Sequence, residues 1–538
     1  MYSNNRLGFW QYVVVLCLVI AGIWVGHIMS DYNFDSETEQ KLDTILEMIS
    51  TNYVDNISTD SLIEKTIPQL LKNLDPHSVY ISKEEVEFAN RDLESSFFGV
   101  GVQFQIMSDS VCIVEVVSGG PAEKEGVLAG DRIIEVDDKP FTGKEITNEK
   151  VFRNLRGAKD TKVKIKVKRS TSDTPLTFEI IRGEIPSKSV DASYMINDSI
   201  GYVRIGTFAY NTYPELLQAV NSLSYNGARN YILDLRGNGG GLLDQAVLIA
   251  NEFLEPGREI VEIRGRIKGG DANWRADGLG MFSQEPLVIL VDEFSASASE
   301  IVAGAMQDND RALIIGRRTF GKGLVQRLVN LPDSSQIRLT VQRYYTPSGR
   351  CIQKDFTRGE NSDYETEILN RYNNGEVFNL DSAKIDKTKI FTTVGGRTVY
   401  GGGGILPDVF VPSDTSEVTN YYLKVANDGL LSKYAYEYAD LNRENLSQAE
   451  NIEQLLAKLP PEHVLLNNFV QYAANKGVKK RWYYINISSR LIINQLQALI
   501  ARDILGMNAY FEIYNTTDPT VIKAVEKIRS GMTNVVSE

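Results

Sequence analysis

The order of hydrophobic and polar positions begins with an apolar run that predicts a membrane span. Residues 9–29 contain no Asp, Glu, Lys or Arg and are about long enough to cross a bilayer. Arg6 precedes the run and acidic residues follow it, so the positive-inside rule places the N-terminus in the cytoplasm. We predict a cytoplasmic tail and uncleaved signal anchor over residues 1–30, single-pass in the inner membrane, with the body of the protein in the periplasm or extracytoplasmic space. A removed signal peptide is the alternative, and it leaves the body on the same side.

Helical spacing of apolar residues then predicts an arm over residues 31–95. Ser36 and Glu39 form a capping-box pattern at its start. Two sets of apolar positions recur with helical periodicity: Leu42, Ile45, Leu46 and Ile49, and then Leu62, Ile63, Ile67, Leu70, Leu71 and Leu74. The second set ends before Asp75-Pro76-His77, a turn in which we expect His77 to fix the junction with the next domain.

Residues 96–183 change to short strands and glycine turns. Alternating Lys and apolar residues over 162–168 predict a strand with one solvated face. A helix start at Pro121-Ala122, a turn at 129–131 and a strand at 133–136 follow the order found in PDZ domains, which this segment resembles. A glycine-rich hairpin is the structural alternative.

The resemblance implies a peptide-binding site at the glycine loop that opens this segment. PDZ domains add an extended peptide to their sheet as a strand and hold its C-terminal carboxylate on backbone N–H groups. The candidate carboxylate-binding residues are Phe98, Gly99, Val100, Gly101 and Val102. Glycine at two of these positions lets the backbone approach the carboxylate closely.

Residues 184–414 alternate strands and helices, which predicts an α/β core with a largely parallel sheet. The apolar strand patterns cover 200–205, 231–235, 287–291 and 312–315, and the helical patterns lie near 213–226, 243–253 and 297–308. The glycine-rich stretch 265–281 predicts a loop at the rim of a site. The polar stretch 354–389 predicts an insertion into this core.

Residues 415–538 return to helical periodicity and predict a C-terminal helical domain. The aromatic residues Tyr510, Phe511 and Tyr514 suit a core or an assembly surface better than a cofactor site. Asp518 and Pro519 are suited to the cap and first position of a last helix.

Composition narrows the partners and cofactors. A net charge of −13 at pH 7 argues against nucleic acid as a partner, because nucleic acids select basic surfaces. The three cysteines have no spacing typical of a metal site or a disulfide framework. We predict no metal and no cofactor.

Two short segments carry the candidate chemistry. Ser297 lies in Ser-Ala-Ser-Ala-Ser-Glu at a predicted strand-to-helix turn, and Lys322 lies between two glycines 25 residues later. A buried neutral lysine can act as the base that activates a serine. The chain has only three histidines: His27 lies in the predicted membrane span, and His77 and His463 lie far out in sequence on predicted helical arms. A Ser-His-Asp triad is therefore disfavoured.

Together these segments resemble the C-terminal processing peptidases, also called tail-specific proteases, over roughly residues 36–410. The resemblance rests on the ordered motifs Leu-Asp-Pro-His-Ser at 74–78, the PDZ signature, Asp-Leu-Arg-Gly-Asn-Gly-Gly-Gly at 234–241, the serine segment and Phe-Gly-Lys-Gly at 320–323. It implies a crotonase/ClpP-like α/β protease core carrying a PDZ domain.

The resemblance also implies roles for particular residues. Ser297 would be the nucleophile, Lys322 the base and Gln326 the residue that orients the base. One oxyanion donor would be the N–H of Ala298, and the other would come from the glycine run, with Gly241 the first candidate and Gly240 the second. Each such donor stabilises the transition state by on the order of 3 kcal/mol. Asp234, Arg236 and Asn238 are expected to brace this loop.

Each of these residues has a structural alternative. Ser297 and Glu300 form a capping-box pattern, so the serine could simply cap its helix. Lys322 could be a surface residue in a turn, and Gln326 an amide at a strand edge. Ser295 and Ser299 are candidates for the nucleophile only if the register differs.

The sequence thus predicts a membrane-anchored serine endopeptidase that binds C-terminal tails of exported proteins on its PDZ domain and cuts through a Ser-Lys acyl-enzyme. Further partners would be other copies of the same chain in a homo-oligomer, or an adaptor protein that recruits the substrate. The alternative hypothesis is a catalytically silent PDZ scaffold on a peptidase-like core. An acyl-CoA enzyme of the related crotonase-like fold is disfavoured by the PDZ segment.

Overall fold

The computed structural model describes residues 36–90, 93–94, 96–107, 109–117, 119–169, 172–359, 362–383 and 385–531. The chain divides into two compact units, residues 1–74 and residues 75–538. The predicted anchor, residues 9–29, lies outside the described residues. Within the described ranges, no helix combines the length and apolarity needed to cross a bilayer.

The first unit contains the two predicted helices, α2 (Ser36–Asn52) and α3 (Thr59–Lys72). The side chain of Ser58 caps α3 by accepting a hydrogen bond from the N–H of Ser61. The predicted arm extended to residue 95, but a short strand, β1 (Val79–Ile81), and the helix α4 (Val86–Asn90) belong to the second unit.

The segment that resembles a PDZ domain forms an antiparallel sheet in the strand order β3-β4-β5-β7-β8, with β6 paired to β5. Its elements are β3 (Val102–Met107), β4 (Ser110–Val116), α5 (Pro121–Lys124), β5 (Arg132–Val136), β6 (Lys139–Pro140), α6 (Asn148–Leu155), β7 (Lys162–Lys168) and β8 (Leu176–Ile181). The strand predicted at 162–168 is confirmed, with its apolar residues buried and its lysines on the solvated face. Two strands outside this sheet, β2 (Ser96–Gly99) and β9 (Gly183–Pro186), pair with each other.

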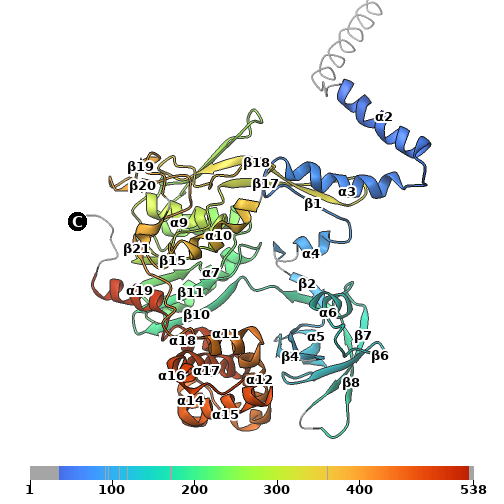
Figure 1. The fold of residues 1–538 in the computed structure, drawn as a ribbon. Coiled ribbons are helices and arrows are strands. Elements are labelled where there is room, and N and C mark those ends of the chain that lie inside the picture. Colours follow the sequence, from blue (N-terminus) through green and yellow to red (C-terminus); the bar gives the residue numbers. More distant parts are fainter. Residues whose placement is uncertain are drawn as a thin grey trace, which may run out of the picture. The chain divides into compact units, whose positions relative to one another are not determined.

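The α/β core is built on a six-stranded sheet in the order β10-β11-β12-β15-β16-β21 (Figure 1). Its strands are β10 (Val190–Asn197), β11 (Ile200–Ile205), β12 (Asn230–Asp234), β15 (Leu287–Val291), β16 (Leu313–Gly316) and β21 (Val409–Phe410). The first two strands form an antiparallel pair and the remaining neighbours are parallel. The largely parallel sheet predicted from the alternation of strands and helices is therefore confirmed.

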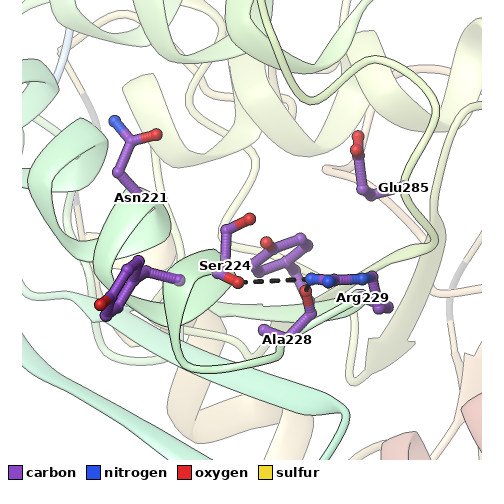
Figure 2. Close-up of a pocket in the computed structure, with 7 residues that line it drawn as sticks. Asn221, Ser224, Ala228, Arg229 and Glu285 are labelled. Carbon is purple, nitrogen blue, oxygen red and sulfur yellow. Dashed lines mark hydrogen bonds between the residues drawn. The ribbon is translucent and has the colours of Figure 1, made fainter.

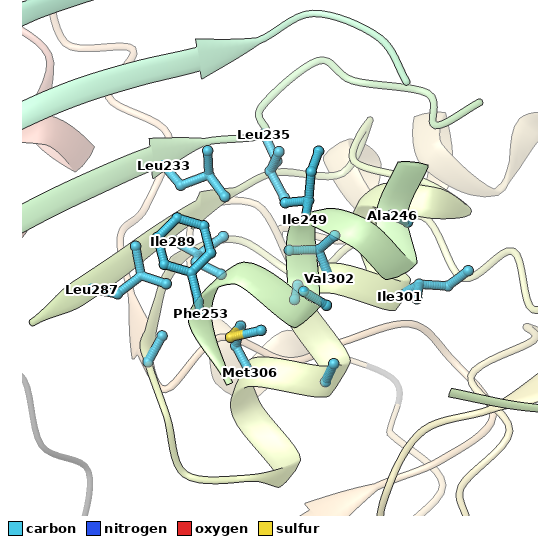
Figure 3. Close-up of a cluster of buried hydrophobic side chains, with 14 of the residues drawn as sticks. Leu233, Leu235, Ala246, Ile249, Phe253, Leu287, Ile289, Ile301, Val302 and Met306 are labelled. Atoms are coloured by element: carbon cyan, nitrogen blue, oxygen red, sulfur yellow. The ribbon is translucent and has the colours of Figure 1, made fainter. Parts of the chain in front are cut away.

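Alternate side chains of the core strands enter two separate clusters, one on each face of the sheet. Leu287, Ile289 and Val291 pack on one face with apolar residues of α7 (Thr212–Tyr225), α8 (Leu243–Phe253) and α9 (Ala298–Asp308) (Figure 3). Val288 and Leu290 face the other side, where α19 (Pro519–Arg529) covers the sheet. The sheet is thus buried on both faces, as expected for parallel strands.

A second, antiparallel sheet lies in the same unit, in the order β1-β18-β13-β14 with β17 also paired to β18. Its remaining strands are β13 (Glu259–Gly265), β14 (Ala272–Arg275), β17 (Leu324–Asn330) and β18 (Gln336–Tyr345). The stretch 265–281 was predicted to be a loop, but β14 within it pairs with β13. The sequence of this stretch is polar and flanked by glycines, so it does not show the pattern of a strand. The strand β14 forms because it pairs with β13.

The polar stretch 354–389, predicted as an insertion, holds the helices α10 (Ser362–Asn373) and η2 (Leu380–Ser382) and is followed by the hairpin β19 (Ile390–Thr392) and β20 (Thr398–Tyr400). Its charges are not all solvated. The buried Arg371 donates to the carbonyl oxygens of residues 318, 319 and 320, and Glu376 pairs with the buried Arg318. The stretch therefore buttresses the chain just before Lys322.

The C-terminal segment forms a helical bundle with its own apolar core. Its helices are α11 (Asn420–Asn427), α12 (Leu430–Leu441), α13 (Arg443–Leu446), α14 (Ile452–Lys458), α15 (Glu462–Asn475), α16 (Trp482–Ile487), α17 (Ser489–Leu505) and α18 (Met507–Tyr514). The aromatic residues of α18 pack partly buried against the bundle and the core sheet, which favours the core interpretation. Asp518 caps α19 by accepting from the N–H groups of Thr520 and Val521, as its sequence predicted.

The two-sided burial of the core sheet gives a stability prediction. Replacing Ile289 with Ala should lower the free energy of unfolding by about 2–5 kcal/mol, because the side chain is fully buried and its removal leaves a cavity. Urea denaturation followed by intrinsic fluorescence measures the change. The matched control is Leu279→Ala, whose side chain is 81% exposed and should change the free energy by less than about 0.5 kcal/mol. Equal effects of the two variants would contradict this assignment of the core.

Candidate active site

Ser297 lies where β15 has ended and α9 begins, in a strained backbone conformation. It occupies the N-cap position with φ 56° and ψ −112°, a region that residues with a Cβ rarely adopt. Its N–H donates to Glu300 Oε2 at 2.9 Å, which helps to hold this conformation. Strain of this kind costs on the order of 1–3 kcal/mol and collects at functional sites.

The two neighbouring serines are committed to other bonds. Ser295 and Ser299 are both fully buried. The hydroxyl of Ser295 donates to the carbonyl of Leu235 at 2.8 Å, and that of Ser299 to the carbonyl of Asn238 at 2.9 Å. Ser297 alone of the three is partly exposed to solvent, so the geometry favours it as the nucleophile.

The glycine run after β12 lies directly against the start of α9. A Cβ added to Gly240 would lie 2.8 Å from Ser297 Cβ and 2.9 Å from the backbone nitrogen of Ala298, so only glycine allows this approach. Asn238 fixes the run, because its side chain donates to the carbonyl of Ile205 and accepts from the N–H of Gly240 at 2.8 Å.

Of the candidate oxyanion donors, Ala298 and Gly241 are better placed than Gly240. The N–H of Gly240 already donates to Asn238. Among the hydrogen bonds of the described residues, none uses the N–H of Ala298 or of Gly241. Free backbone donors at a helix start beside a serine can stabilise a developing oxyanion.

Lys322 precedes β17 and is held in a largely dehydrated position. Its Nζ donates to Gln326 Oε1 at 3.0 Å. Burial, reinforced by the nearby charge of Arg338, lowers the pKa of Lys322 to about 8, while Glu300 and Asp75 oppose the shift. A substantial fraction of the amine is therefore neutral near physiological pH, which a general base requires.

Glu300 connects the serine and lysine segments. This fully buried carboxylate accepts from the N–H groups of Ser297, Gly321 and Lys322 at 2.7–2.9 Å, and from the hydroxyl of Thr319 at 2.5 Å. Burial raises the pKa of Glu300, and the donated hydrogen bonds act against that rise. One side chain thus fixes the backbone on both sides of the candidate dyad.

A buried ion-pair network supports the strand ends behind the glycine run. Asp234 is fully buried and pairs with Arg236 at 2.7 Å and with Arg204 at 3.3 Å. Arg236 also pairs with Asp518, the cap of α19. The expected bracing role of Asp234, Arg236 and Asn238 agrees with these contacts.

The candidate carboxylate loop, residues 98–102, includes the end of β2, the turn at residues 100–101 and the first residue of β3. Gly99 pairs with Gly183 in β9 and forms a bridge with Arg156. A Cβ on Gly101, whose φ is 80°, would lie 2.9 Å from the side chain of Ile185. After the loop, β3 is at the edge of its sheet, paired to β4 on one side only among the described strands.

His77 was expected to fix the junction of the arm and the PDZ segment, but its contacts are with the peptidase core. Its carbonyl accepts from Gln326 Nε2 at 2.7 Å, and its ring lies against Tyr364 of α10. Sequence reasoning missed this because the contact joins residues far apart in the chain.

No cluster of His, Cys, Asp or Glu suited to a metal occurs among the described residues. A pocket of about 440 Å³ lies near the start of β12, lined by Arg229, Tyr231 and Glu285 among others (Figure 2). It adjoins the amino ends of β12 and β15, whereas Ser297 follows the carboxyl end of β15. The pocket is therefore not part of the serine–lysine site.

Comparisons with known proteins identify the family of the chain. A carboxy-terminal-processing protease from Bartonella bacilliformis is 38% identical over 57% of this chain and 71% of its own length. The carboxy-terminal processing protease CtpA from Bacillus subtilis is 35% identical over 58% of this chain and 66% of its own length. The chain belongs to the carboxy-terminal processing proteases.

Protein-family models match three separate segments of the chain. Residues 199–366 match peptidase family S41, residues 99–181 match the PDZ domain, and residues 421–506 match a family of unknown function, DUF8443. The protease is therefore an S41 serine peptidase with a PDZ domain and a helical C-terminal extension. A solved photosystem II D1 C-terminal processing protease is 27% identical, covering 69% of this chain and 92% of its own, at a TM-score of 0.34.

The charge of Arg338 gives a pH prediction for this protease. Replacing Arg338 with Gln removes a cation that disfavours the charged amine, so the pKa of Lys322 should rise. The rising limb of kcat/KM should then move from near pH 8 to higher pH, with a rate at pH 7 lower by a factor of about 2 to 10. The matched control is Arg327→Gln on β17, an exposed residue that should leave the profile unchanged. An unshifted profile in the Arg338 variant would refute the electrostatic argument.

Glu300 gives a second prediction. Glutamine has one acceptor oxygen where the carboxylate has two. In Glu300→Gln an NH₂ group therefore faces either the N–H groups of Ser297 and Lys322 or the N–H of Gly321 and the hydroxyl of Thr319, and leaves these buried donors unpaired. Because small displacements of reacting groups are costly, kcat should fall by about a hundredfold or more. Turnover is measured per folded protein, with near-ultraviolet circular dichroism as the check on folding. Glu255→Gln, at an exposed site, should leave kcat unchanged. Near-normal turnover in the Glu300 variant would show that the carboxylate does not align the site.

Proposed function

We propose that this protease is a membrane-anchored endopeptidase outside the cytoplasm that binds C-terminal tails on its PDZ domain and cleaves through an acyl-enzyme on Ser297. The observation that carries the proposal is the environment of Lys322. Its amine is buried, has a pKa lowered to about 8 and donates to Gln326, while its backbone shares the Glu300 carboxylate with Ser297.

Acylation would proceed as follows. Neutral Lys322 Nζ accepts the proton of Ser297 Oγ as that oxygen attacks the scissile carbonyl carbon. The negative charge that develops on the carbonyl oxygen is stabilised by the N–H groups of Ala298 and Gly241. The protonated lysine then gives its proton to the leaving amine nitrogen as the C–N bond breaks, which leaves an ester on Ser297.

Deacylation would use the same groups with water in place of the amine. Lys322 removes a proton from a water molecule that attacks the ester carbonyl, and the same backbone donors stabilise the second oxyanion. The proton returns to Ser297 Oγ as the ester C–O bond breaks. The shortened polypeptide is released with a new carboxylate, and the enzyme needs no metal or cofactor for either half.

Tail recognition is supported by the free edge of β3. An extended peptide can add to this edge as a further strand, with its terminal carboxylate at the loop of residues 98–102. Anchoring is supported by the sequence of residues 9–29, and its orientation by Arg6 and the acids that follow the run. We also propose that the parallel core belongs to the crotonase/ClpP-like group, on its alternation of strands and covering helices.

Cleavage of a defined tail tests the function. The full chain in detergent is mixed with a model protein that ends in an apolar tail, and products are followed by mass spectrometry. Cleavage should need the free C-terminal carboxylate and should fall at least a thousandfold in Ser297→Ala and in Lys322→Ala.

The controls separate the proposal from its alternatives. The same substrate with an amidated C-terminus should be cut poorly, because the PDZ loop cannot hold it. Ser295→Ala removes a neighbouring hydroxyl that lies outside the proposed dyad and should retain activity. Tail binding without cleavage by the intact chain would favour a silent scaffold, and cleavage that survives Lys322→Ala would rule out lysine as the base.

A further inference from the structure

The orientation of the Gln326 amide is decided by a backbone group, not by Lys322. Gln326 lies between Lys322 Nζ, 3.0 Å from Oε1, and the carbonyl of His77, 2.7 Å from Nε2. A neutral amine both donates and accepts, so it could face either end of the amide. A backbone carbonyl only accepts, so the NH₂ end must face His77 and the oxygen must face the lysine.

The turn that presents this carbonyl, residues 75–78, is held by the carboxylate of Asp75. Asp75 accepts from the N–H groups of His77 and Ser78 at 2.8 and 2.9 Å, and from the hydroxyl of Thr340 at 3.0 Å. The hydroxyl of Ser78 donates to Asp75 and accepts from the N–H of Thr340. Thr340 is the cross-strand partner of Gln326 in the β17–β18 pair. The turn is therefore fixed to the same strand pair that carries the glutamine.

The insertion helix α10 holds the turn from the other side. Tyr364 is 6% exposed, and its hydroxyl lies 2.7 Å from His77 Nε2. Burial and the charge of Lys322 lower the pKa of His77 to about 3, so the ring is neutral and Nε2 can accept. The amide of Gln353 donates weakly to the same hydroxyl at 3.4 Å, which leaves the proton of the hydroxyl for His77.

We propose that the turn at residues 75–78, clamped by Tyr364 of α10 and by Thr340 of β18, is a positioning element for the general base. It acts on Lys322 only through the amide of Gln326. With Oε1 fixed, one N–H of the amine is engaged, and the direction of its lone pair is restricted. Tyr364, His77, Asp75 and Thr340 are positioning residues that do not touch the substrate. This inference rests on the proposed serine–lysine mechanism.

Two conservative variants each remove one contact that holds the turn at residues 75–78, one from α10 and the other from β18. Tyr364→Phe removes only the hydroxyl that binds the His77 ring. Thr340→Val removes only the hydroxyl that donates to Asp75. Each should lower kcat about three- to tenfold with KM changed less than about twofold, a loss on the scale of the net contribution of one hydrogen bond. The matched control is Tyr213→Phe, which removes a hydroxyl bonded to Glu252 at 2.9 Å and should leave kcat unchanged.

Coupling to Gln326 distinguishes positioning from general structural support. Each variant is made in the wild-type and Gln326→Ala chains. The rate at which a fluorophosphonate phosphonylates Ser297, with loss of fluoride, is then measured per mole of folded full-length protein. If the turn acts through the amide, Tyr364→Phe and Thr340→Val should have no further effect in the Gln326→Ala background.

The possible results of these measurements decide between the proposal and a purely structural role for the turn. Unchanged kcat in both single variants overturns the proposal, as does a loss that persists undiminished in the Gln326→Ala background. If Gln326→Ala is phosphonylated too slowly to measure, the single variants decide. A fall in kcat with KM unchanged supports positioning, and a rise in KM with kcat unchanged overturns it. Failure of the serine–lysine mechanism itself is recognised separately, by cleavage that survives Ser297→Ala or Lys322→Ala.

Discussion

The proposed catalytic arrangement depends on one buried carboxylate. Glu300 lies one helical turn after Ser297 and receives hydrogen bonds from the serine backbone and from the loop that carries Lys322. A buried charge without partners would be strongly destabilising, so the carboxylate requires both loops to be in place. The same requirement makes the serine and lysine segments assemble together, although they come from different parts of the core.

The proposed mechanism sets a second constraint, which is that Lys322 must remain partly neutral among charged neighbours. The region around Lys322 contains Arg338, Glu300 and Asp75, whose effects on its pKa differ in sign. Burial is the largest influence, so access of water to this loop sets the strength of the base. Arg371 and Glu376 of the polar stretch 354–389 fix the chain before Lys322 through buried hydrogen bonds, and thereby keep this environment closed.

Local sequence patterns predicted the helices and strands well. They did not predict the contacts that position Lys322 and Gln326. The parallel strands, the alternating strand at 162–168 and the capped helix at Asp518 all follow from periodicity and from cap preferences over a few residues. Ser297, Lys322 and Gln326 came from a family resemblance, and the structure places the latter two in contact. The links from His77 and Tyr364 to Gln326 span long sequence separations, and no local pattern encodes them. The strand at 272–275 was missed for the same reason, because its pairing partner decides it.

Helix α19 has a consequence for the order in which the supporting contacts form during synthesis. Asp518 both caps α19 and pairs with Arg236, which in turn holds Asp234 beside the glycine run. Since a polypeptide is synthesised from its N-terminus, Ser297 and Lys322 leave the ribosome well before Asp518 does. The ion pairs behind the glycine run are therefore complete only once α19 has been synthesised. A nascent chain that ends before α19 contains both Ser297 and Lys322 but lacks this part of their support.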